Sequence, residues 1–288
     1  MMDNHFSNLE RAEVLTQALP YIKRYNSKVV VIKYGGNAMI NEELKQQVME
    51  DIVLLQLVGV KVVLVHGGGP EITNTMKKLG KETQFVGGLR VTDKESAEIA
   101  QMVLAGKVNK NLANLLQVNG GRAIGLSGID GGMIYAKMKN PEIGFVGEIT
   151  DVDVEPIVTL LEHNYIPVVS TVGCDADGNV YNINADTAAS AIAAALSAER
   201  LLELTDIEGI LRDKDDPTSR ISNISVDEAK VLLNDGTISG GMIPKVEGCI
   251  EAIEKGVKTV IIMDGRVPHS ILIEMLTDEG AGSMIYGN

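Results

Sequence analysis

Two stretches near the N-terminus share a pattern that limits the fold strongly: β-branched residues, then glycines, then a helical segment. The first is V-V-V-I-K-Y-G-G (29–36), and the second is K-V-V-L-V-H-G-G-G-P (61–70). Between them lies a helical pattern that Asn41 can cap and that begins with acidic residues, which suits a helix N-terminus. Two successive strand–glycine–helix units predict βαβ topology with a parallel sheet, and hence an α/β fold.

The rest of the chain continues this alternation, apart from one segment that precedes the first strand. Residues 8–25 carry apolar side chains at helical spacing, and Pro20 should bend or break that helix. Such a helix must bury its apolar stripe either on its own domain or on another subunit, and the pattern does not decide between them. Further on, we expect a hairpin at 81–93, helices at 93–118, 155–163, 186–198, 226–233, 246–255 and 269–277, and strands at 122–126, 166–170, 200–205, 258–263 and 283–286.

Composition excludes several functional classes. The 288 residues carry a net charge of −13 with no long basic run, which argues against nucleic acid as a partner. Cys174 and Cys249 lie far apart, so neither a zinc site nor a disulfide framework is indicated. The polar, acidic N-terminus does not resemble a secretory signal, and no apolar run approaches the roughly 20 residues of a membrane helix. We therefore expect a cytoplasmic protein that does not enter a membrane.

Glycines and lysines together suggest a phosphate site. Glycine pairs or triplets occur at 35–36, 67–69 and 240–241, and none belongs to a Walker motif or a complete dinucleotide fingerprint. Each alone could be a tight turn, but helix N-termini at the carboxyl ends of parallel strands bind anions. Lys33 ends a buried strand, where a cation is costly without an anion, and Lys245 follows G-G-M-I-P at a helix start.

Three more polar clusters could contribute, although each also has a purely structural reading. Y-N-I-N-A-D (181–186) could be a helix cap or could place Asn182, Asn184 and Asp186 around a substrate and the lysines. L-T-D-I-E-G-I (204–210) could be a turn or a nucleotide contact, and Arg90 is expected to be exposed on its hairpin, where it could clamp a carboxylate. No catalytic base is evident. A carboxylate acceptor would need none, because it is already ionised at neutral pH.

Six motifs in order identify a resemblance to the amino acid kinase family, nearest to those members that phosphorylate N-acetyl-L-glutamate. They are K-Y-G-G-N-A-M, V-H-G-G-G-P, G-L-R-V-T-D, Y-N-I-N-A-D, L-T-D-I-E-G and G-G-M-I-P-K, and the resemblance covers nearly all of residues 26–288. It implies an open three-layer αβα sandwich with a mainly parallel central sheet and an N-terminal extension helix. The implied units are residues 1–26 (oligomerisation and regulation), 27–178 (acyl-amino-acid binding) and 179–288 (ATP binding).

The resemblance also implies an activity: ATP-dependent phosphorylation of the side-chain carboxylate of N-acetyl-L-glutamate to N-acetylglutamyl 5-phosphate, in arginine biosynthesis. Magnesium would enter with ATP, without protein ligands. The implied site residues are Lys33, Lys245 and Asp186 for catalysis, Gly68, Gly69, Arg90 and Asn182 for the acyl amino acid, Gly35, Gly36 and Gly241 for phosphate, and Thr205, Asp206 and Gly209 for the nucleotide.

The N-terminal helix and the C-terminal segment resemble those of arginine-inhibited, hexameric members built as trimers of dimers. An inhibitor site for L-arginine would then involve Tyr21, His269, Glu274 and Gly280; otherwise these residues form a capping helix and a glycine helix end. Some relatives also bind a PII-type signalling protein. The remaining alternatives are a kinase of glutamate, aspartate or carrier-bound α-aminoadipate, an arginine-sensing protein without catalysis, and a dehydrogenase.

Overall fold

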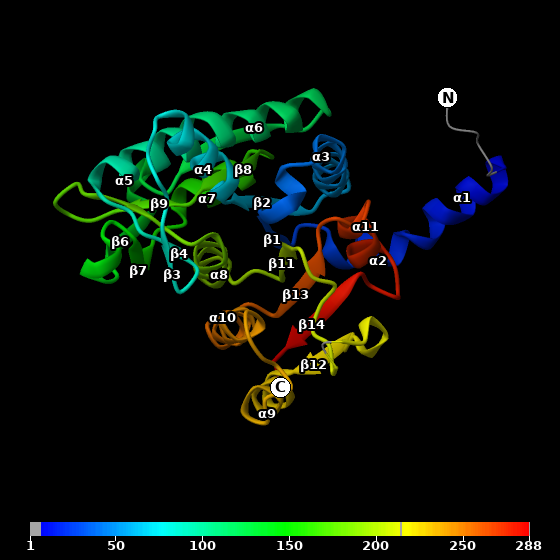
Figure 1. Cartoon of the computed structure of the whole chain (residues 1–288). Helices are drawn as coiled ribbons and strands as arrows, with labels where there is room; N and C mark the ends of the chain where they lie inside the picture. Colours follow the sequence, from blue (N-terminus) through cyan, green and yellow to red (C-terminus); the bar gives the residue numbers. More distant parts are fainter. Residues whose placement is uncertain (1–6, 214, 288) are drawn as a thin grey trace.

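An eight-stranded sheet runs through the centre of the computed structural model, which describes residues 7–213 and 215–287 (Figure 1). Residues 1–6 of the predicted N-terminal unit and residue 288 of the predicted C-terminal unit lie outside the described residues. In spatial order the strands are β12 (Asn223–Ser225), β14 (Gly282–Tyr286), β13 (Thr259–Asp264), β11 (Arg200–Thr205), β1 (Val29–Tyr34), β2 (Lys61–His66), β8 (Ile166–Ser170) and β5 (Ala123–Ser127).

This sheet is mainly parallel, as the sequence predicts. From β13 through β11, β1, β2 and β8 to β5 every pairing is parallel, whereas β14 pairs antiparallel with β13 and β12 pairs parallel with β14, so these two strands run opposite to the other six. Because parallel strands end on the same edge, the loops after β1, β2 and β11 meet there. The glycine turns of the sequence follow two of those strands.

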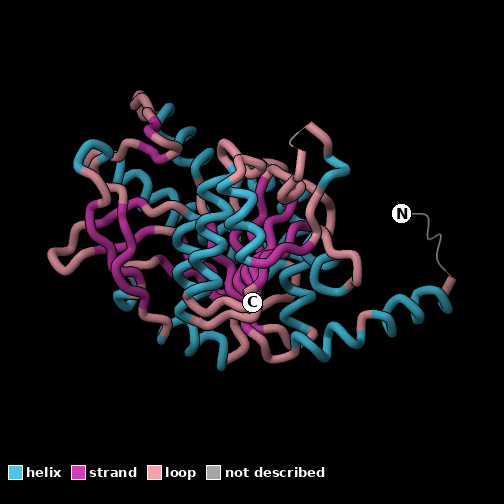
Figure 2. The backbone as a smooth tube through the Cα atoms, turned by 90° about the horizontal axis from the view of Figure 1, so that it is seen from below, coloured by secondary structure: helices cyan, strands magenta, loops and turns pink. Residues whose placement is uncertain are grey.

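Alternating side chains of the strands build two cores, one on each face of the sheet. On β1, Val30 and Ile32 belong to one core and Val31 to the other, and all three are fully buried. Helices cover both faces (Figure 2). One layer contains α3 (Glu42–Leu57), α6 (Asn109–Val118) and α11 (Ser270–Leu276), and the other contains α7 (Glu155–Glu162), α8 (Ala185–Ala195), α9 (Val226–Asn234) and α10 (Met242–Glu254). The predicted open three-layer αβα sandwich is confirmed.

A smaller sheet and a hairpin lie beside the N-terminal half of the central sheet. The small sheet has the order β10 (Val180–Asn182), β9 (Val172–Cys174), β6 (Ile134–Met138) and β7 (Gly147–Val152). The predicted hairpin consists of β3 (Phe85–Val86) and β4 (Leu89–Arg90), and it follows α4 (Gly69–Lys78). Short 3₁₀ turns lie at η1 (Gly36–Met39), η3 (Asp130–Gly132), η4 (Pro141–Ile143) and η5 (Pro217–Ser219).

The helix predicted at 93–118 is continuous but changes its winding in the middle. It consists of α5 (Lys94–Gln101), a π-helical segment η2 (Met102–Val108) and α6. Such π-helical turns are frequent near functional sites. Here the wider turn contributes Leu104 to the wall of the cavity described below.

Two predicted helices begin or break elsewhere than expected. α10 starts at Met242 rather than 246, so Lys245 lies in its first turn, where the missing N–H of Pro244 costs no hydrogen bond. Residues 8–25 form two helices, α1 (Asn8–Gln17) and α2 (Leu19–Tyr25), that break at Ala18, and Pro20 sits inside the first turn of α2.

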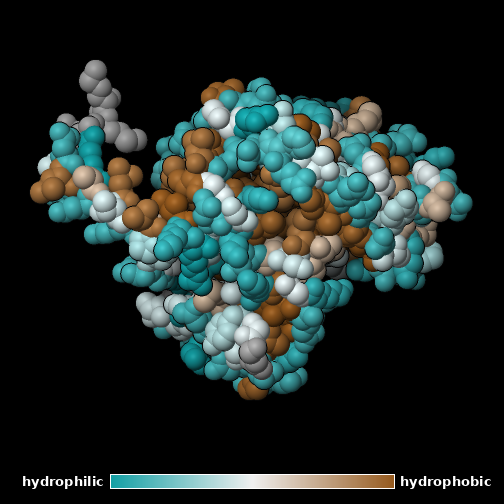
Figure 3. Space-filling model, turned by 180° about the vertical axis from the view of Figure 1, so that it is seen from behind, coloured by the Kyte–Doolittle hydropathy of each residue, from teal (hydrophilic) through white to brown (hydrophobic). Residues whose placement is uncertain are grey.

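α1 projects away from the body of the molecule and buries none of its residues (Figures 1 and 3). Ser7 and Glu10 form a capping box at its start. Leu9 and Leu15 are 68% and 72% exposed, so the apolar stripe does not pack on its own domain. Within the described residues, no helix combines the length and apolar character needed to span a bilayer.

The predicted boundary between residues 178 and 179 falls in a tight turn, residues 175–179, that joins β9 to β10. The Asp175 carboxylate accepts hydrogen bonds from the backbone and side-chain nitrogens of Asn179. Since β9 and β10 pair within the small sheet, the chain passes through that sheet at this point. The division at residues 178 and 179 stays a prediction.

Candidate functional site

The carboxyl ends of β1 and β2 border a cavity of about 260 Å³, which we call the Lys33 cavity. Its wall contains Lys33, both glycine loops that the sequence singles out, and residues from β4, β10 and the start of α8. α4 begins at Gly69 and α8 at Ala185, and both residues line the cavity. Two helix N-termini with unpaired N–H groups therefore face one space, which favours an anion there.

An ion-paired trio lies at this cavity. The Nζ of Lys33 is 2.7 Å from Asp186 Oδ1, and the Nζ of Lys245 is 3.0 Å from Asp186 Oδ2. The two lysines come from different elements, β1 and α10, and Asp186 lies in the first turn of α8. The sequence prediction that Asp186 orients both lysines agrees with this geometry.

The charges of the trio set its protonation. Burial raises the pKa of Asp186, but the positive charges of Lys33 and Lys245 outweigh it and lower the pKa to about 2. Burial lowers the pKa of Lys245, and the Asp186 carboxylate more than restores it, so the net change is upward. At neutral pH these two groups are charged, and with Lys33 ionised the trio carries a net single positive charge beside the two helix N-termini.

Glycine is needed at two positions of the loops. Gly36 has φ +69°, and a Cβ there would lie 3.0 Å from an oxygen of Asp206. Gly68 has extended backbone, but a Cβ there would lie 2.7 Å from Leu104 Cδ2 on the π-helical segment. The glycines thus allow close approach of one loop to a polar side chain and of the other to the cavity wall.

Arg90 is buried rather than exposed, which corrects the sequence prediction. Its Nη2 donates to Gly69 O at 3.0 Å and to Thr73 Oγ1 at 2.8 Å, and its guanidinium stacks over the Phe85 ring at 4.8 Å. The hairpin folds back on α4, so the guanidinium is covered by contacts that lie far away in sequence. It still lines the Lys33 cavity, and burial lowers its pKa.

The asparagines of Y-N-I-N-A-D divide into two roles. Asn182 and Asn184 both line the cavity, and Asn184 also caps α8, because its side chain accepts a hydrogen bond from Thr187 N at 3.0 Å. The structural and the functional readings of this motif are therefore compatible.

The residues predicted to contact nucleotide lie beyond the trio and do not line the Lys33 cavity. Thr205 ends β11, and its Oγ1 bonds to Ile207. The Asp206 carboxylate is next to Gly36, and Gly209 has φ +139° against Ser283. Gly241 is the N-cap of α10. Gly35, by contrast, lines the cavity, and a Cβ there would be 3.2 Å from Lys33 Nζ.

A second pocket, of about 180 Å³, lies between α2 and the C-terminal segment; we call it the α2–α11 pocket. It brings together Tyr21, Glu274 and Gly280 from the predicted arginine residues. Tyr21 donates a hydrogen bond to Asp278, and Glu274 is ion-paired with Arg200 at 2.9 Å. His269, the N-cap of α11, does not line this pocket. Its Nδ1 lies 2.7 Å from Oδ1 of Asp51 on α3.

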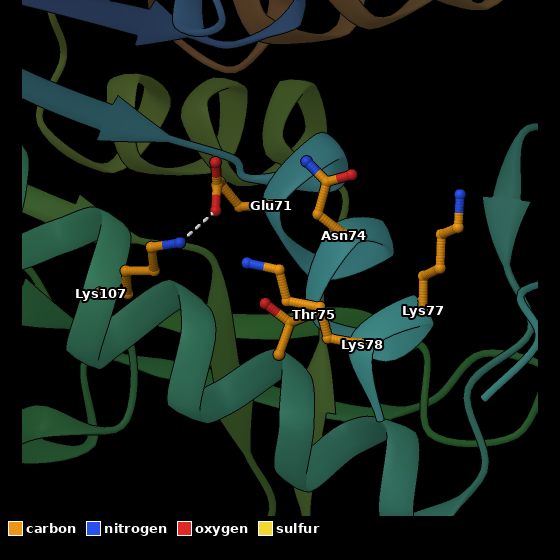
Figure 4. Close-up of a pocket in the computed structure, with 6 residues that line it drawn as sticks. All are labelled: Glu71, Asn74, Thr75, Lys77, Lys78 and Lys107. Carbon is orange, nitrogen blue, oxygen red and sulfur yellow. Dashed lines mark hydrogen bonds and ion pairs between the residues drawn. The ribbon is translucent and has the colours of Figure 1, made fainter. Parts of the chain in front are cut away.

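A larger hollow, about 460 Å³, lies elsewhere, between α4 and the π-helical segment (Figure 4). Its lysines are Lys77, Lys78 and Lys107; Lys107 is paired with Glu71 at 2.6 Å, and Lys77 points away from that pair. Lys77 and Lys78 occupy the last turn of α4, where cations stabilise a helix C-terminus. This accounts for the lysines on α4 without a ligand, so we place the chemistry in the smaller Lys33 cavity.

Sequence reasoning missed three residues near the Lys33 cavity: Leu104, Thr73 and Glu203. Leu104 lines the cavity, and Thr73 accepts a hydrogen bond from Arg90, which lines it; both contacts arise through tertiary packing. Glu203 had a signal in L-L-E-L-T (201–205), because a single acid inside an apolar strand next to the first strand must face something polar.

Comparison with known proteins agrees with this geometry. Residues 28–264 match the model of the amino acid kinase family. The chain is 54% identical to acetylglutamate kinase of Brachyspira hyodysenteriae, covering 99% of both chains, and 52% identical to acetylglutamate kinase of Caldanaerobacter subterraneus, covering 96% and 93%. Among solved structures, N-acetylglutamate synthase of Neisseria gonorrhoeae, complexed with coenzyme A and N-acetyl-glutamate, superposes with a TM-score of 0.84 at 24% identity. That match covers 96% of this chain and 63% of the synthase, and it shows a shared fold.

Proposed function

The chain belongs to the amino acid kinase family, and from this premise we propose that it transfers the γ-phosphoryl group of ATP to the side-chain carboxylate of N-acetyl-L-glutamate. The observation that carries the proposal is the Lys33–Asp186–Lys245 trio at the cavity. The choice of acceptor is supported by the acetylglutamate kinases that share half or more of their residues with this chain. The product is an acyl phosphate, N-acetylglutamyl 5-phosphate, in arginine biosynthesis.

Phosphoryl transfer depends mainly on positioning and on positive charge near the transferred group. Lys33 and Lys245 pair with different oxygens of the Asp186 carboxylate, so both ammonium groups are held close together and can neutralise oxygens of the phosphoryl group during its transfer. The N–H groups of Gly36, Gly68 and Gly69 add fixed dipoles. The acceptor carboxylate is ionised at neutral pH and attacks phosphorus without a base.

Substrate binding follows from the cavity wall. Arg90 and Asn182 would bind the α-carboxylate and the amide of the acyl amino acid. The guanidinium of Arg90 is already oriented by Gly69 and Thr73, so little rotamer freedom is lost when it binds a carboxylate. Thr205, Asp206 and Gly209 would contact the nucleotide beyond the trio, and Gly241 would contact its phosphates together with Gly35 and Gly36.

Magnesium would enter with the nucleotide. Both oxygens of the Asp186 carboxylate are ion-paired with lysines, so that carboxylate is poorly placed to bind a cation directly. The ion would bridge phosphate oxygens and neutralise part of their charge.

We further propose that L-arginine binds in the α2–α11 pocket and inhibits the enzyme. Glu274, Asp278 and Glu279 line this pocket, and their charge suits a guanidinium. Glu274 already pairs with Arg200, so the added guanidinium would bind chiefly to the other acids or displace Arg200. Tyr21 on α2 bonds to Asp278, which connects the pocket to the N-terminal helices.

The exposed stripe of α1 would be buried against α1 of another subunit. Leu9 and Leu15 of α1, with Leu19 at the start of α2, are 62% to 72% exposed in the single chain. Burial of such side chains contributes about 1.5–3 kcal/mol each, which favours association through this helix into dimers and a hexamer.

The test is ADP formation with Mg²⁺–ATP and a panel of acceptors: N-acetyl-L-glutamate, L-glutamate and L-aspartate. We expect turnover with the first alone, its loss in Lys33→Ala, and its retention in Lys258→Ala, which removes a lysine on the opposite edge of the sheet. Added arginine should reduce turnover. A folded protein that binds arginine but turns over no acceptor would instead be an arginine sensor.

A further inference from the structure

Glu203 is a buried acid to which the mechanism above gives no role. It lies in β11, directly beside Lys33 of β1 in the parallel register. The residue is only 1% exposed. Its Oε2 atom has no hydrogen-bond partner within the described part of the chain. An unpaired buried carboxylate is costly, so it must gain from its surroundings or be protonated.

The alternation of β11 places Glu203 toward the catalytic trio. Leu202 and Leu204 belong to the core under α3 and α6, while Leu201 belongs to the core under α8 and α10. Glu203, two residues after Leu201, therefore faces α8 and α10. The ionisable groups that interact with it there are Lys33 on β1, Asp186 on α8, and Lys245 and Cys249 on α10, while its partner on β13 is Ile262.

We propose that Glu203 is a proton-linked counter-charge of the Lys33–Lys245 pair, which takes up a proton when a polyphosphate binds and releases it when the polyphosphate leaves. It is a positioning residue, since it acts through the lysines and does not touch the substrate. The inference rests on the proposed function, because the polyphosphate is that of the nucleotide. The proton comes from solvent and returns there, and no other bond is made or broken.

The charges explain the direction of the effect. Without ligand, two lysines face Asp186, and an ionised Glu203 brings the net charge of the group to zero. A polyphosphate on the other side of the lysines adds negative charge, competes for the ammonium groups and so favours neutral Glu203. When Glu203 is neutral, the full positive charge of the pair is directed to the phosphoryl group.

The titration of Glu203 lies in the range where this exchange can operate. Burial raises its pKa, the Asp186 charge raises it further, and the lysines oppose both, giving a value of about 7. Cys249 does not compete for this role, because burial raises the pKa of its thiol well above the ordinary value. A Glu203 with only a structural role would affect folding, but it would take up no proton when a polyphosphate binds.

The first test measures protons taken up on binding of Mg²⁺–AMP-PNP, by isothermal titration calorimetry at pH 7.5 in buffers of different ionisation enthalpy. Wild type should take up a substantial fraction of one proton. Glu203→Gln and Glu203→Leu should lose that fraction, whereas the matched control Glu199→Gln should keep it. Glu199 pairs with Lys258 at the opposite end of β11, away from the cavity.

The second test is kcat/KM for ATP between pH 6 and 9. Above the pKa of Glu203, wild type should lose up to about tenfold per pH unit, and both Glu203 variants should show a flatter profile. Titration of the nucleotide itself is common to all variants and cancels in the comparison. Two variants of different polarity guard against a folding defect in one of them.

The outcomes separate the two proposals. Equal proton uptake and equal pH profiles in wild type and in both Glu203 variants would overturn the inference and leave the kinase function intact. Failure of wild type to bind Mg²⁺–AMP-PNP would overturn the kinase function, and the inference with it.

Discussion

Asp186→Asn is the substitution that most directly perturbs the trio. It keeps the shape of the side chain but removes the negative charge between Lys33 and Lys245. The two ammonium groups would then repel one another, and their positions relative to the phosphoryl group would no longer be held. We expect kcat to fall by about 100-fold or more, the range seen when a preorganised charge-stabilising group is removed.

The pKa of Asp186 also indicates how much its ion pairs contribute to the free energy of unfolding. The lysines outweigh burial and lower the pKa of Asp186 from 3.8 to about 2. At about 1.4 kcal/mol per pKa unit, this lowering corresponds to about 2 kcal/mol of unfolding free energy at neutral pH. Removing one partner of a fully buried pair costs about 3–5 kcal/mol. Because the side chain of Asp186 is 29% exposed, we expect the smaller loss of about 2 kcal/mol for Asp186→Asn.

The sign of the pH dependence follows from the lowered pKa. The stabilisation is complete above the unfolded-state pKa near 4 and is lost as the pH falls through the folded-state value near 2. Urea unfolding should therefore show wild type more stable than Asp186→Asn at pH 5, where Asp186 is ionised, and the gap should narrow towards pH 8, because removal of the Asp186 charge also lowers the pKa of the neighbouring Glu203. Asp177→Asn, the same change in an exposed turn, should leave both stability and kcat unchanged. Equal midpoints and equal kcat for wild type and Asp186→Asn would refute the reasoning.

Four further results are expected. Gly68→Ala should lower kcat/KM for the acyl amino acid, because its Cβ would lie 2.7 Å from Leu104, and added Leu104→Ala should partly restore it in steady-state assays. Burial raises the pKa of Glu203, so its ionisation destabilises wild type as the pH rises from 4.5 to about 7. Over this range Glu203→Leu should become more stable relative to wild type, by up to about 3 kcal/mol of unfolding free energy in urea titrations. Glu274→Gln should weaken arginine inhibition in dose–response curves, and an unchanged curve would exclude Glu274 from the site. Leu15→Glu should reduce the mass measured by analytical ultracentrifugation, since it places a charge on the exposed stripe of α1.

Local patterns predicted the central architecture well. β-branched runs followed by glycines gave β1, β2 and the parallel sheet, because strand propensity, turn chemistry and helix capping agree at each junction. The rule that parallel strands end on one edge predicted that Lys33 lies next to the glycine loops, whereas the grouping of Lys33, Asp186 and Lys245 was implied by the family resemblance. The distances between them could not be predicted, since they depend on how α8 and α10 pack on the sheet.

Where the predictions failed, long-range packing was responsible. Arg90 was expected at the surface because it lies on a two-stranded hairpin, yet contacts with Gly69 and Thr73 of α4 bury it. The π-helical turn that carries Leu104 has no recognisable pattern in the sequence. The break predicted at Pro20 does occur, but it falls at Ala18, two residues earlier, for a local reason: proline is tolerated in the first turn of the helix that follows.

The central claim is that the Lys33 cavity makes an acyl phosphate on the side chain of N-acetyl-L-glutamate. The most direct measurement is to run the reaction with Mg²⁺–ATP in hydroxylamine, which converts an acyl phosphate to a hydroxamate, and to identify the product by mass spectrometry. We expect N-acetylglutamate 5-hydroxamate from wild type and none from Lys33→Ala. ATP consumption without this hydroxamate, or equal yield from Lys33→Ala, would contradict it.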